Sequence, residues 1–153
     1  MEPNEVIDIF KDTGALLEGH FILSSGLHSS VYLQCAIALK APSVATQFGV
    51  AIASRFREFV FETVASPAIG GIVIGYEVAR QLGANFIWTE REHGEMSLRR
   101  GFTVHEGERI LVVEDVHSSP ARPIDREAFV APSLPRATKR MVIFVDGSNP
   151  AAG

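Results

Sequence analysis

Apolar residues recur along the chain at two different spacings, which predict separate helices and strands. Apolar positions three or four residues apart predict a helix that Asn4 caps and Gly14 ends, and a longer helix that Ser43 caps. The same spacing predicts a third helix from Ile72 to Leu82, with Gly83 as its C-terminal cap.

Short apolar runs bounded by turn residues predict the strands, and their order predicts the fold. The expected strands are Phe21–Leu23, Val31–Leu33, Phe61–Ala65, Asn85–Thr89, Ile110–Val113 and Arg140–Val145. The first two flank a Ser/Gly turn and predict a hairpin. The later strands alternate with helices or long connections, which is typical of a mostly parallel sheet flanked by helices, an α/β fold. We therefore expect one domain over residues 1–153, with a small N-terminal flap or hood (1–35) and a core (36–153).

The bulk composition narrows the class of protein. With 153 residues, 46% hydrophobic and 21% charged, the chain fits one soluble globular domain. Its net charge of -4 argues against nucleic acid as a partner. The single cysteine, Cys35, excludes an internal disulfide and suits a reducing compartment. The acidic start and the lack of an apolar run of ~20 residues predict neither a signal peptide nor a membrane span. We expect a cytoplasmic protein without a membrane partner.

Two carboxylates directly follow a strand that should be buried on both faces. Glu114 and Asp115 come after the aliphatic run Ile110–Val113. Ligands of open α/β sheets bind at the carboxyl ends of the strands, so this pair is well placed for chemistry. Neighbouring strand residues point to opposite faces, so the two acids should have different roles. Spacing alone also fits a solvated acidic turn or a helix cap.

A second candidate site lies where a strand passes into a helix. The turn Ser66–Gly71 would present backbone amides and the positive end of the helix to an anion. Gly70 and Gly71 could equally serve tight packing of the strand against the helix.

The most charged segment of the chain runs from Glu90 to Phe102. Such a segment is usually a solvated hairpin. Its arginines Arg91, Arg99 and Arg100, together with His93, could instead clamp a polyanion near the two candidate sites.

Several motifs in the same order resemble type I phosphoribosyltransferases, and more narrowly the orotate phosphoribosyltransferases. The matching segments are Thr13–Phe21, Leu23–Gly26, Pro67–Gly71, Leu98–Phe102, Val112–Val116 and Val145–Asp146. The resemblance implies the type I phosphoribosyltransferase fold with an N-terminal hood. It also implies transfer of ribose 5-phosphate from phosphoribosyl pyrophosphate to orotate in pyrimidine (UMP) biosynthesis, by a homodimer with a shared active site.

The resemblance also implies roles for individual residues. Catalytic roles fall on Asp115, Glu114 and Arg91. Contacts to phosphoribosyl pyrophosphate fall on Glu114, Asp115, Val116, His117, Ser118, Ser119, Pro120, Ala121, Arg122, Ser24, Arg91, Ala68, Ile69 and Gly70. Contacts to orotate fall on Ser118, Tyr32 and Gly147. Mg²⁺ is the implied cofactor, with no residue of this chain assigned as its direct ligand.

The loop that should hold the 5′-phosphate departs from the family pattern. The family has Thr-Thr-Gly-Gly-Ser where this chain has Ser118–Arg122. Pro120 lacks an N–H donor, and Ala121 resists the positive φ that glycine allows. A cradle of backbone amides should be weakened by both residues.

Two further departures concern the base and the lid. Gly147 stands where the family has an arginine that binds the orotate carboxylate, and the lid between Thr89 and Phe102 has no lysine, leaving Arg91 as the nearest substitute. Two readings follow. One is an active orotate phosphoribosyltransferase. The other is a diverged, weakly active or inactive relative that binds a nucleotide or a partner subunit. A phosphoribosyltransferase for a purine base is a more distant third.

Overall fold

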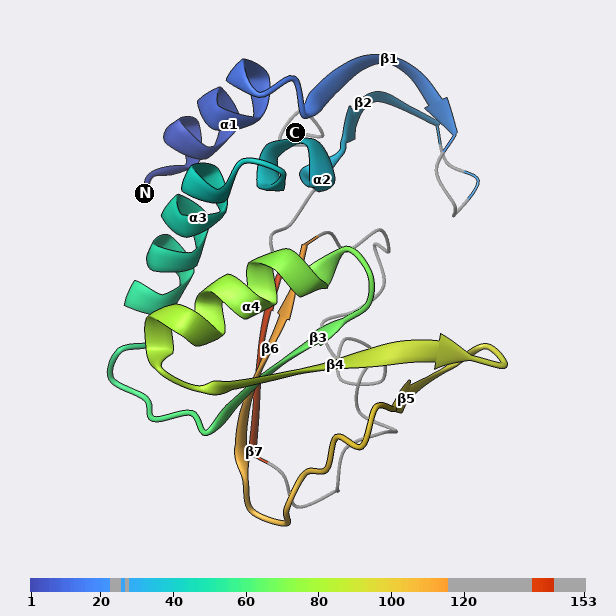
Figure 1. Cartoon of the computed structure of the whole chain (residues 1–153). Coiled ribbons are helices and arrows are strands. Elements are labelled where there is room, and N and C mark those ends of the chain that lie inside the picture. Colours follow the sequence, from blue (N-terminus) through green and yellow to red (C-terminus); the bar gives the residue numbers. More distant parts are fainter. Residues whose placement is uncertain (23–25, 27, 116–138, 145–153) are drawn as a thin grey trace.

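The chain forms two separate sheets together with four helices in the part that the structure describes (Figure 1). The computed structural model describes residues 1–22, 26, 28–115 and 139–144, the last six as backbone only. The helices are α1 (Pro3–Asp12), α2 (Cys35–Leu39), α3 (Pro42–Ser54) and α4 (Gly71–Leu82). The strands are β1 (Leu16–Ile22), β2 (His28–Leu33), β3 (Thr63–Pro67), β4 (Asn85–Glu92), β5 (Glu95–Leu98), β6 (Arg109–Glu114) and β7 (Lys139–Phe144).

Two of the predicted helix starts are wrong by two residues. α1 is capped by Glu2 instead of Asn4, and α3 by Ala41 instead of Ser43. In both helices a proline occupies the first turn, where its fixed φ suits a helix and its missing N–H costs nothing. The predicted end of α4 is confirmed, because Gly83 has φ 66° as its C-terminal cap. The short helix α2 was not predicted.

The larger sheet has the strand order β5-β4-β3-β6-β7. β3 pairs in parallel with β4 and β6, and β6 pairs in parallel with β7. Only the edge pair β4–β5 is antiparallel. The predicted mostly parallel α/β sheet is therefore confirmed. Because β3 and β6 are parallel neighbours, their carboxyl ends lie at the same edge of the sheet.

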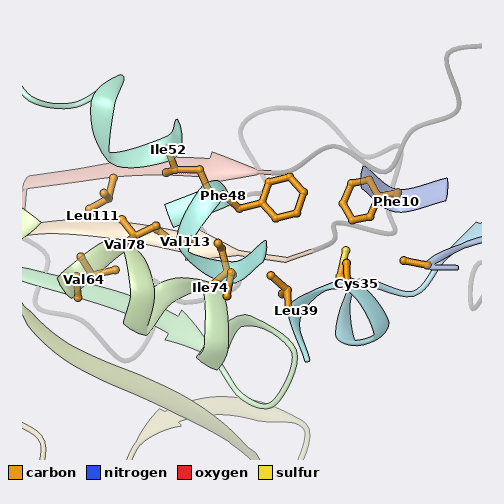
Figure 2. Packing of buried hydrophobic residues seen from close by; sticks show 14 residues of the cluster. Phe10, Cys35, Leu39, Phe48, Ile52, Val64, Ile74, Val78, Leu111 and Val113 are labelled. Atoms are coloured by element: carbon orange, nitrogen blue, oxygen red, sulfur yellow. The ribbon is translucent and has the colours of Figure 1, made fainter. Parts of the chain in front are cut away.

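β6 is buried on both faces, as its unbroken apolar run predicts. Leu111 and Val113 join the cluster under α3 and α4, which also contains Val64 and Ile74 (Figure 2). The alternate residues of β6 face a smaller cluster on the other side, made of Ala65, Ile87, Ile110 and Val112. The four side chains of β6 from Ile110 to Val113 are each at most 4% exposed. The strand that leads to the acidic pair is thus held rigidly from both sides.

α4 is fixed against α3 by a close contact at a glycine. Gly49 of α3 lies directly against Glu77 of α4, with no room for a side chain between them. Glu77 is buried and accepts hydrogen bonds from Arg80 Nη2 (2.6 Å) and Gln81 Nε2 (2.8 Å). These bonds hold the pKa of Glu77 down at about 2, the bond from Arg80 being the largest cause. The packing sets the position of α4 and so of the turn that precedes it.

The smaller sheet is the hairpin β1–β2, which lies beyond α2 and apart from the larger sheet (Figure 1). Both strands are longer than predicted. Within the described part of the chain, no helix is long and apolar enough to cross a membrane.

Candidate functional site

The turn after β3 and the acidic pair after β6 meet at the carboxyl edge of the sheet. The closest point is between Gly70 and Asp115. A Cβ added to Gly70 would lie 2.5 Å from Asp115 Oδ2 and 2.6 Å from Oδ1. The two sites that the sequence predicts separately are therefore one site. Gly70 has φ −57°, so it is the space beside Asp115, and not the backbone conformation, that demands glycine here.

The carboxyl group of Glu114 has an unusual electrostatic environment. Burial raises its pKa to about 7, and the nearby charge of Asp115 adds to the effect. Glu114 thus exists in protonated and ionised forms near neutral pH. The acidic turn suggested as an alternative would be fully solvated, whereas both residues are partly buried.

Cys35 contacts the acidic pair from α2. Its Sγ donates a weak hydrogen bond to the backbone oxygen of Asp115, 3.7 Å away. Burial, followed by the charge of Asp115, raises the pKa of the Cys35 thiol to about 12, so the thiol stays neutral. From the sequence alone, Cys35 indicates only a reducing compartment. No local signal links it to Asp115, because the two residues are 80 positions apart in the chain.

The turn between β3 and α4 exposes its tip to solvent. Ala68 N donates to Thr89 O at 2.8 Å, the Ala68–Ile69 peptide bond is cis, and the Ile69 side chain is 85% exposed. Gly71, the first residue of α4, packs against Pro67. The first amides of a helix have no partner within the helix and carry partial positive charge, so this turn favours an anion. The packing role suggested for Gly71 and the anion-binding role are compatible.

Together these features suit a ligand that carries both hydroxyl and anionic groups. The carboxylates of Glu114 and Asp115 can accept hydrogen bonds from hydroxyls, and the turn at residues 68–70 can bind a phosphate.

The acidic pair also suits a hard divalent cation. Carboxylate oxygens are the ligands that Mg²⁺ prefers. Burial is the largest cause of the raised pKa of Glu114, and a cation would offset the smaller contribution from the charge of Asp115. Among the described residues, no group of three His, Cys, Asp or Glu side chains could hold a metal ion. In the described part of the chain, the acidic pair would therefore hold Mg²⁺ with two carboxylates and not with a three-residue cluster.

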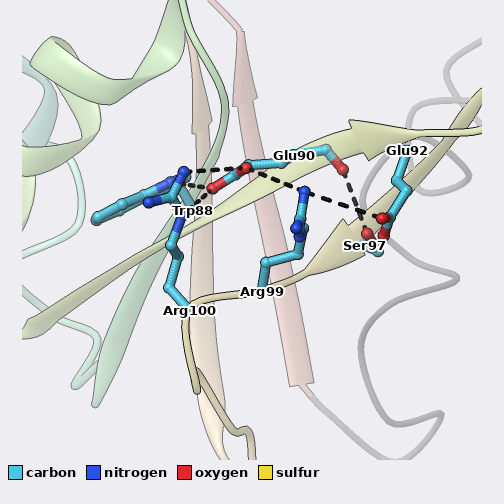
Figure 3. A network of polar contacts seen from close by, with 6 residues as sticks. All are labelled: Trp88, Glu90, Glu92, Ser97, Arg99 and Arg100. Atoms are coloured by element: carbon cyan, nitrogen blue, oxygen red, sulfur yellow. Dashed lines mark hydrogen bonds and ion pairs between the residues drawn. The ribbon is translucent and has the colours of Figure 1, made fainter.

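The charged segment forms the β4–β5 hairpin, as predicted, and two of its arginines pair within it (Figure 3). Arg100 Nε donates to Glu90 Oε1 at 2.7 Å, and Arg99 Nη1 lies 3.8 Å from Glu90 Oε2 and 3.9 Å from Glu92 Oε1. The hydrogen bond from Arg100 is the main cause that lowers the pKa of Glu90. Arg91 Nη1 donates to Gly94 O at 2.8 Å. The hairpin is thus less positive than a count of its arginines suggests.

Other predicted site residues lie elsewhere or outside the described residues. Tyr32 belongs to the β1–β2 sheet, where the centroid of its ring lies 5.5 Å from the ring centroid of Phe21. The predictions for Ser24, Val116–Arg122 and Gly147 fall on residues that the structure does not describe.

This chain is similar in sequence to orotate phosphoribosyltransferases, and similar in fold to a wider set of phosphoribosyltransferases. The chain is 53% identical over 116 residues to the orotate phosphoribosyltransferase of Chlorobium phaeobacteroides strain BS1. The aligned segment covers 76% of this chain and 60% of that protein. The chain therefore spans about three fifths of the length of this relative. No model of a protein family matches this chain.

Solved structures with the same fold bind different bases, to judge by their names. The orotate phosphoribosyltransferase of Aeropyrum pernix matches with a TM-score of 0.66 at 23% identity, over 94% of this chain and 82% of that one. An adenine phosphoribosyltransferase of Thermoanaerobacter pseudethanolicus matches with a TM-score of 0.64 at 14% identity, over 92% and 87%. These likenesses confirm the predicted phosphoribosyltransferase fold.

Proposed function

We propose that this chain, whose aligned 116 residues belong to the orotate phosphoribosyltransferase family, transfers ribose 5-phosphate from phosphoribosyl pyrophosphate to orotate. The products would be orotidine 5′-monophosphate and pyrophosphate, a step of pyrimidine nucleotide synthesis. The observation that carries the proposal is the contact between Gly70 and Asp115, which joins a hydroxyl-binding pair to an anion-binding turn. The single cysteine of the chain suits a reducing compartment, and we propose the cytoplasm.

The described residues would hold the reactants while a ring nitrogen of the base displaces pyrophosphate. Asp115 and Glu114 would bind the two ribose hydroxyls. With a pKa of about 7, Glu114 can donate as well as accept a hydrogen bond. The amides of Ile69 and Gly70 would bind the diphosphate, because the Ala68 amide already donates to Thr89 O. A carbon–nitrogen bond forms at the anomeric carbon while the carbon–oxygen bond to the diphosphate breaks, and the diphosphate leaves with the electron pair. The proton of the ring nitrogen passes to solvent or to the released diphosphate. Correct positioning and stabilisation of the leaving charge are the main contributions of the protein. Bound Mg²⁺ would neutralise part of the diphosphate charge.

We further propose a homodimer in which Arg91 reaches the active site of the neighbouring subunit. The resemblance to the family implies that the β4–β5 hairpin crosses to the neighbouring subunit, and Arg91 is exposed on this hairpin, where its Nη1 donates to Gly94 O. A mixture of Asp115→Asn and Arg91→Ala subunits should regain activity in hybrid dimers, because one of the two sites is then complete. A chain that sediments as a monomer at micromolar concentration would contradict the shared site.

A second candidate function rests on the altered phosphate loop. Pro120 and Ala121 replace residues that supply backbone amides in the family, and Gly147 replaces an arginine. On this reading the chain binds phosphoribosyl pyrophosphate, a nucleotide or a partner subunit but turns over slowly or not at all.

The test is product formation by the whole chain with phosphoribosyl pyrophosphate and Mg²⁺, in the presence of orotate, of adenine, or of no base. Chromatography separates the nucleotides. The proposal predicts orotidine 5′-monophosphate with orotate alone. Formation of adenosine monophosphate from adenine would show that the chain acts on a purine base instead. Binding of phosphoribosyl pyrophosphate without product from either base would favour the second candidate.

A further inference from the structure

Two histidines face each other across the β1–β2 hairpin, away from the site described above. His20 Nε2 and His28 Nδ1 are 2.6 Å apart, and their ring centroids are 4.8 Å apart with the ring planes at 77°. Both side chains are exposed. The hairpin is thus a place where two imidazole nitrogens converge within reach of solvent.

A β-bulge brings His20 to this position. The pairing between β1 and β2 shifts between Glu18 and Phe21, so that Gly19 and His20 together oppose one residue of β2. Such a bulge bends the strand and redirects a side chain. His28 pairs with Ile22, so His20 contacts it from a diagonal position on the opposite strand. The convergence is therefore fixed by the backbone and does not depend on long, flexible side chains.

We propose that His20 and His28 form a binding site for a borderline transition-metal ion such as Zn²⁺, Ni²⁺ or Cu²⁺. Imidazole nitrogen is a preferred ligand of these ions. With metal–nitrogen distances of ~2.0–2.1 Å and near-tetrahedral or square geometry, two ligating nitrogens lie ~2.9–3.4 Å apart. The two facing nitrogens need to separate by ~0.3–0.8 Å from their 2.6 Å contact to admit an ion.

Metal binding requires the proton between the two rings to leave the facing nitrogens, and a change of tautomer allows this. In the metal-free pair, one of the two facing nitrogens is the donor and the other the acceptor. When both facing nitrogens bind the ion, His20 carries its proton on Nδ1 and His28 on Nε2. The exchange is a change of tautomer with no net loss of a proton from the neutral rings.

The site would be open and exchangeable. Within the described ranges, no third His, Cys, Asp or Glu side chain completes a metal-binding group here. Water or a solute would fill the remaining positions, as in metal sites that keep open coordination. A bound ion would also cross-link β1 to β2 and so stiffen the hairpin.

Calorimetric titration of the whole chain with zinc chloride alone, without Mg²⁺ or substrates, tests the site. We expect one ion per chain, with an affinity about tenfold or more lower in both His20→Gln and His28→Gln, because chelation by two linked ligands is lost. The matched control is His93→Asn, which removes an exposed histidine from the turn of the β4–β5 hairpin. Asparagine tolerates the positive φ of 51° at that position. This control should bind zinc like the natural chain.

Nitrogen NMR of the imidazoles is measured on the natural chain, so its result does not depend on whether a variant folds correctly. In the natural chain, zinc should shift His20 Nε2 and His28 Nδ1 together, at the same metal concentration. Separate shifts, unchanged affinity in both glutamine variants, or an equal loss in His93→Asn would overturn the proposal. The titration contains no phosphoribosyl pyrophosphate or base, so its result is independent of the proposed transferase activity.

Discussion

The α-carbon of Gly70 faces the carboxylate of Asp115 so closely that any side chain at residue 70 would occupy the position of the carboxylate oxygens. The contact joins the start of α4 to the end of β6. The turn that we propose to bind phosphate and the acid that we propose to bind hydroxyls are therefore coupled, because a side chain at residue 70 would displace the Asp115 carboxylate.

The first prediction follows from this contact. Gly70→Ala should displace the Asp115 carboxylate and weaken binding of phosphoribosyl pyrophosphate by about tenfold or more, the value of one charge-assisted hydrogen bond. Thermal unfolding should change little, since residue 70 is exposed and its φ suits alanine. Val73→Ala, which shortens a side chain 47% exposed on the same helix, is the control. Equal affinity for Gly70→Ala and Val73→Ala would show that the contact has no role in binding.

The second prediction concerns the pH dependence of stability. The pKa of Glu114 is raised from 4.5 to about 7 in the folded chain, so the folded state binds more protons than the unfolded state between these values. The free energy of unfolding should therefore fall as pH rises from about 4.5 to about 7, and Glu114→Gln should lack this component. Because the side chain is only partly buried, we expect a difference of roughly 1 kcal/mol. Urea unfolding of both proteins across this range measures it. Parallel curves would mean that Glu114 titrates normally.

The third prediction tests the packing that positions α4. Gly49→Ala should destabilise the chain by about 1–2 kcal/mol, because the new Cβ would collide with Glu77, whose backbone carbon is only 3.3 Å from that position. Arg80 and Gln81 prevent Glu77 from turning aside. Val50→Ala, at a residue 40% exposed on α3, should change stability by less than about 0.5 kcal/mol. A more stable Gly49→Ala protein would indicate that helix propensity outweighs the collision.

The sequence predicts the sheet well because burial leaves a clear pattern. The run Ile110–Val113 has no polar residue, and only a strand covered on both faces suits it. Helix starts are predicted less well: serine and asparagine are good caps, but Pro3 and Pro42 begin the helices instead.

The two halves of the candidate site are predictable, but their contact is not. Strand-end acids and a glycine turn are local signals, whereas the fit of Gly70 against Asp115 depends on the spacing of β3 and β6. The pairing of Arg100 with Glu90 was also missed. It depends on the register of β4 and β5 and on the positive φ of 63° at Arg100.

The fourth prediction concerns the altered phosphate loop. The double change Pro120→Gly with Ala121→Gly restores an N–H donor and the conformational freedom of the family's glycines. If each lost amide bond is worth ~1.5–3 kcal/mol, affinity for phosphoribosyl pyrophosphate should rise by roughly two to four orders of magnitude, less whatever Arg122 already contributes. Calorimetry of both proteins with phosphoribosyl pyrophosphate and Mg²⁺ decides it. Ordinary enzyme rates in the natural chain, without a gain from the glycines, would refute this interpretation of the loop.

The central claim is that the acidic pair after β6 recognises the ribose of a phosphoribosyl ligand. The most direct measurement is the affinity for phosphoribosyl pyrophosphate of Asp115→Asn, which keeps the shape of the side chain and removes its charge. It is made both in the natural chain and with glycines at 120 and 121, so that weak binding by the loop does not hide the effect. We expect a loss of about ten- to a hundredfold in affinity. Unchanged affinity in both backgrounds would contradict the claim.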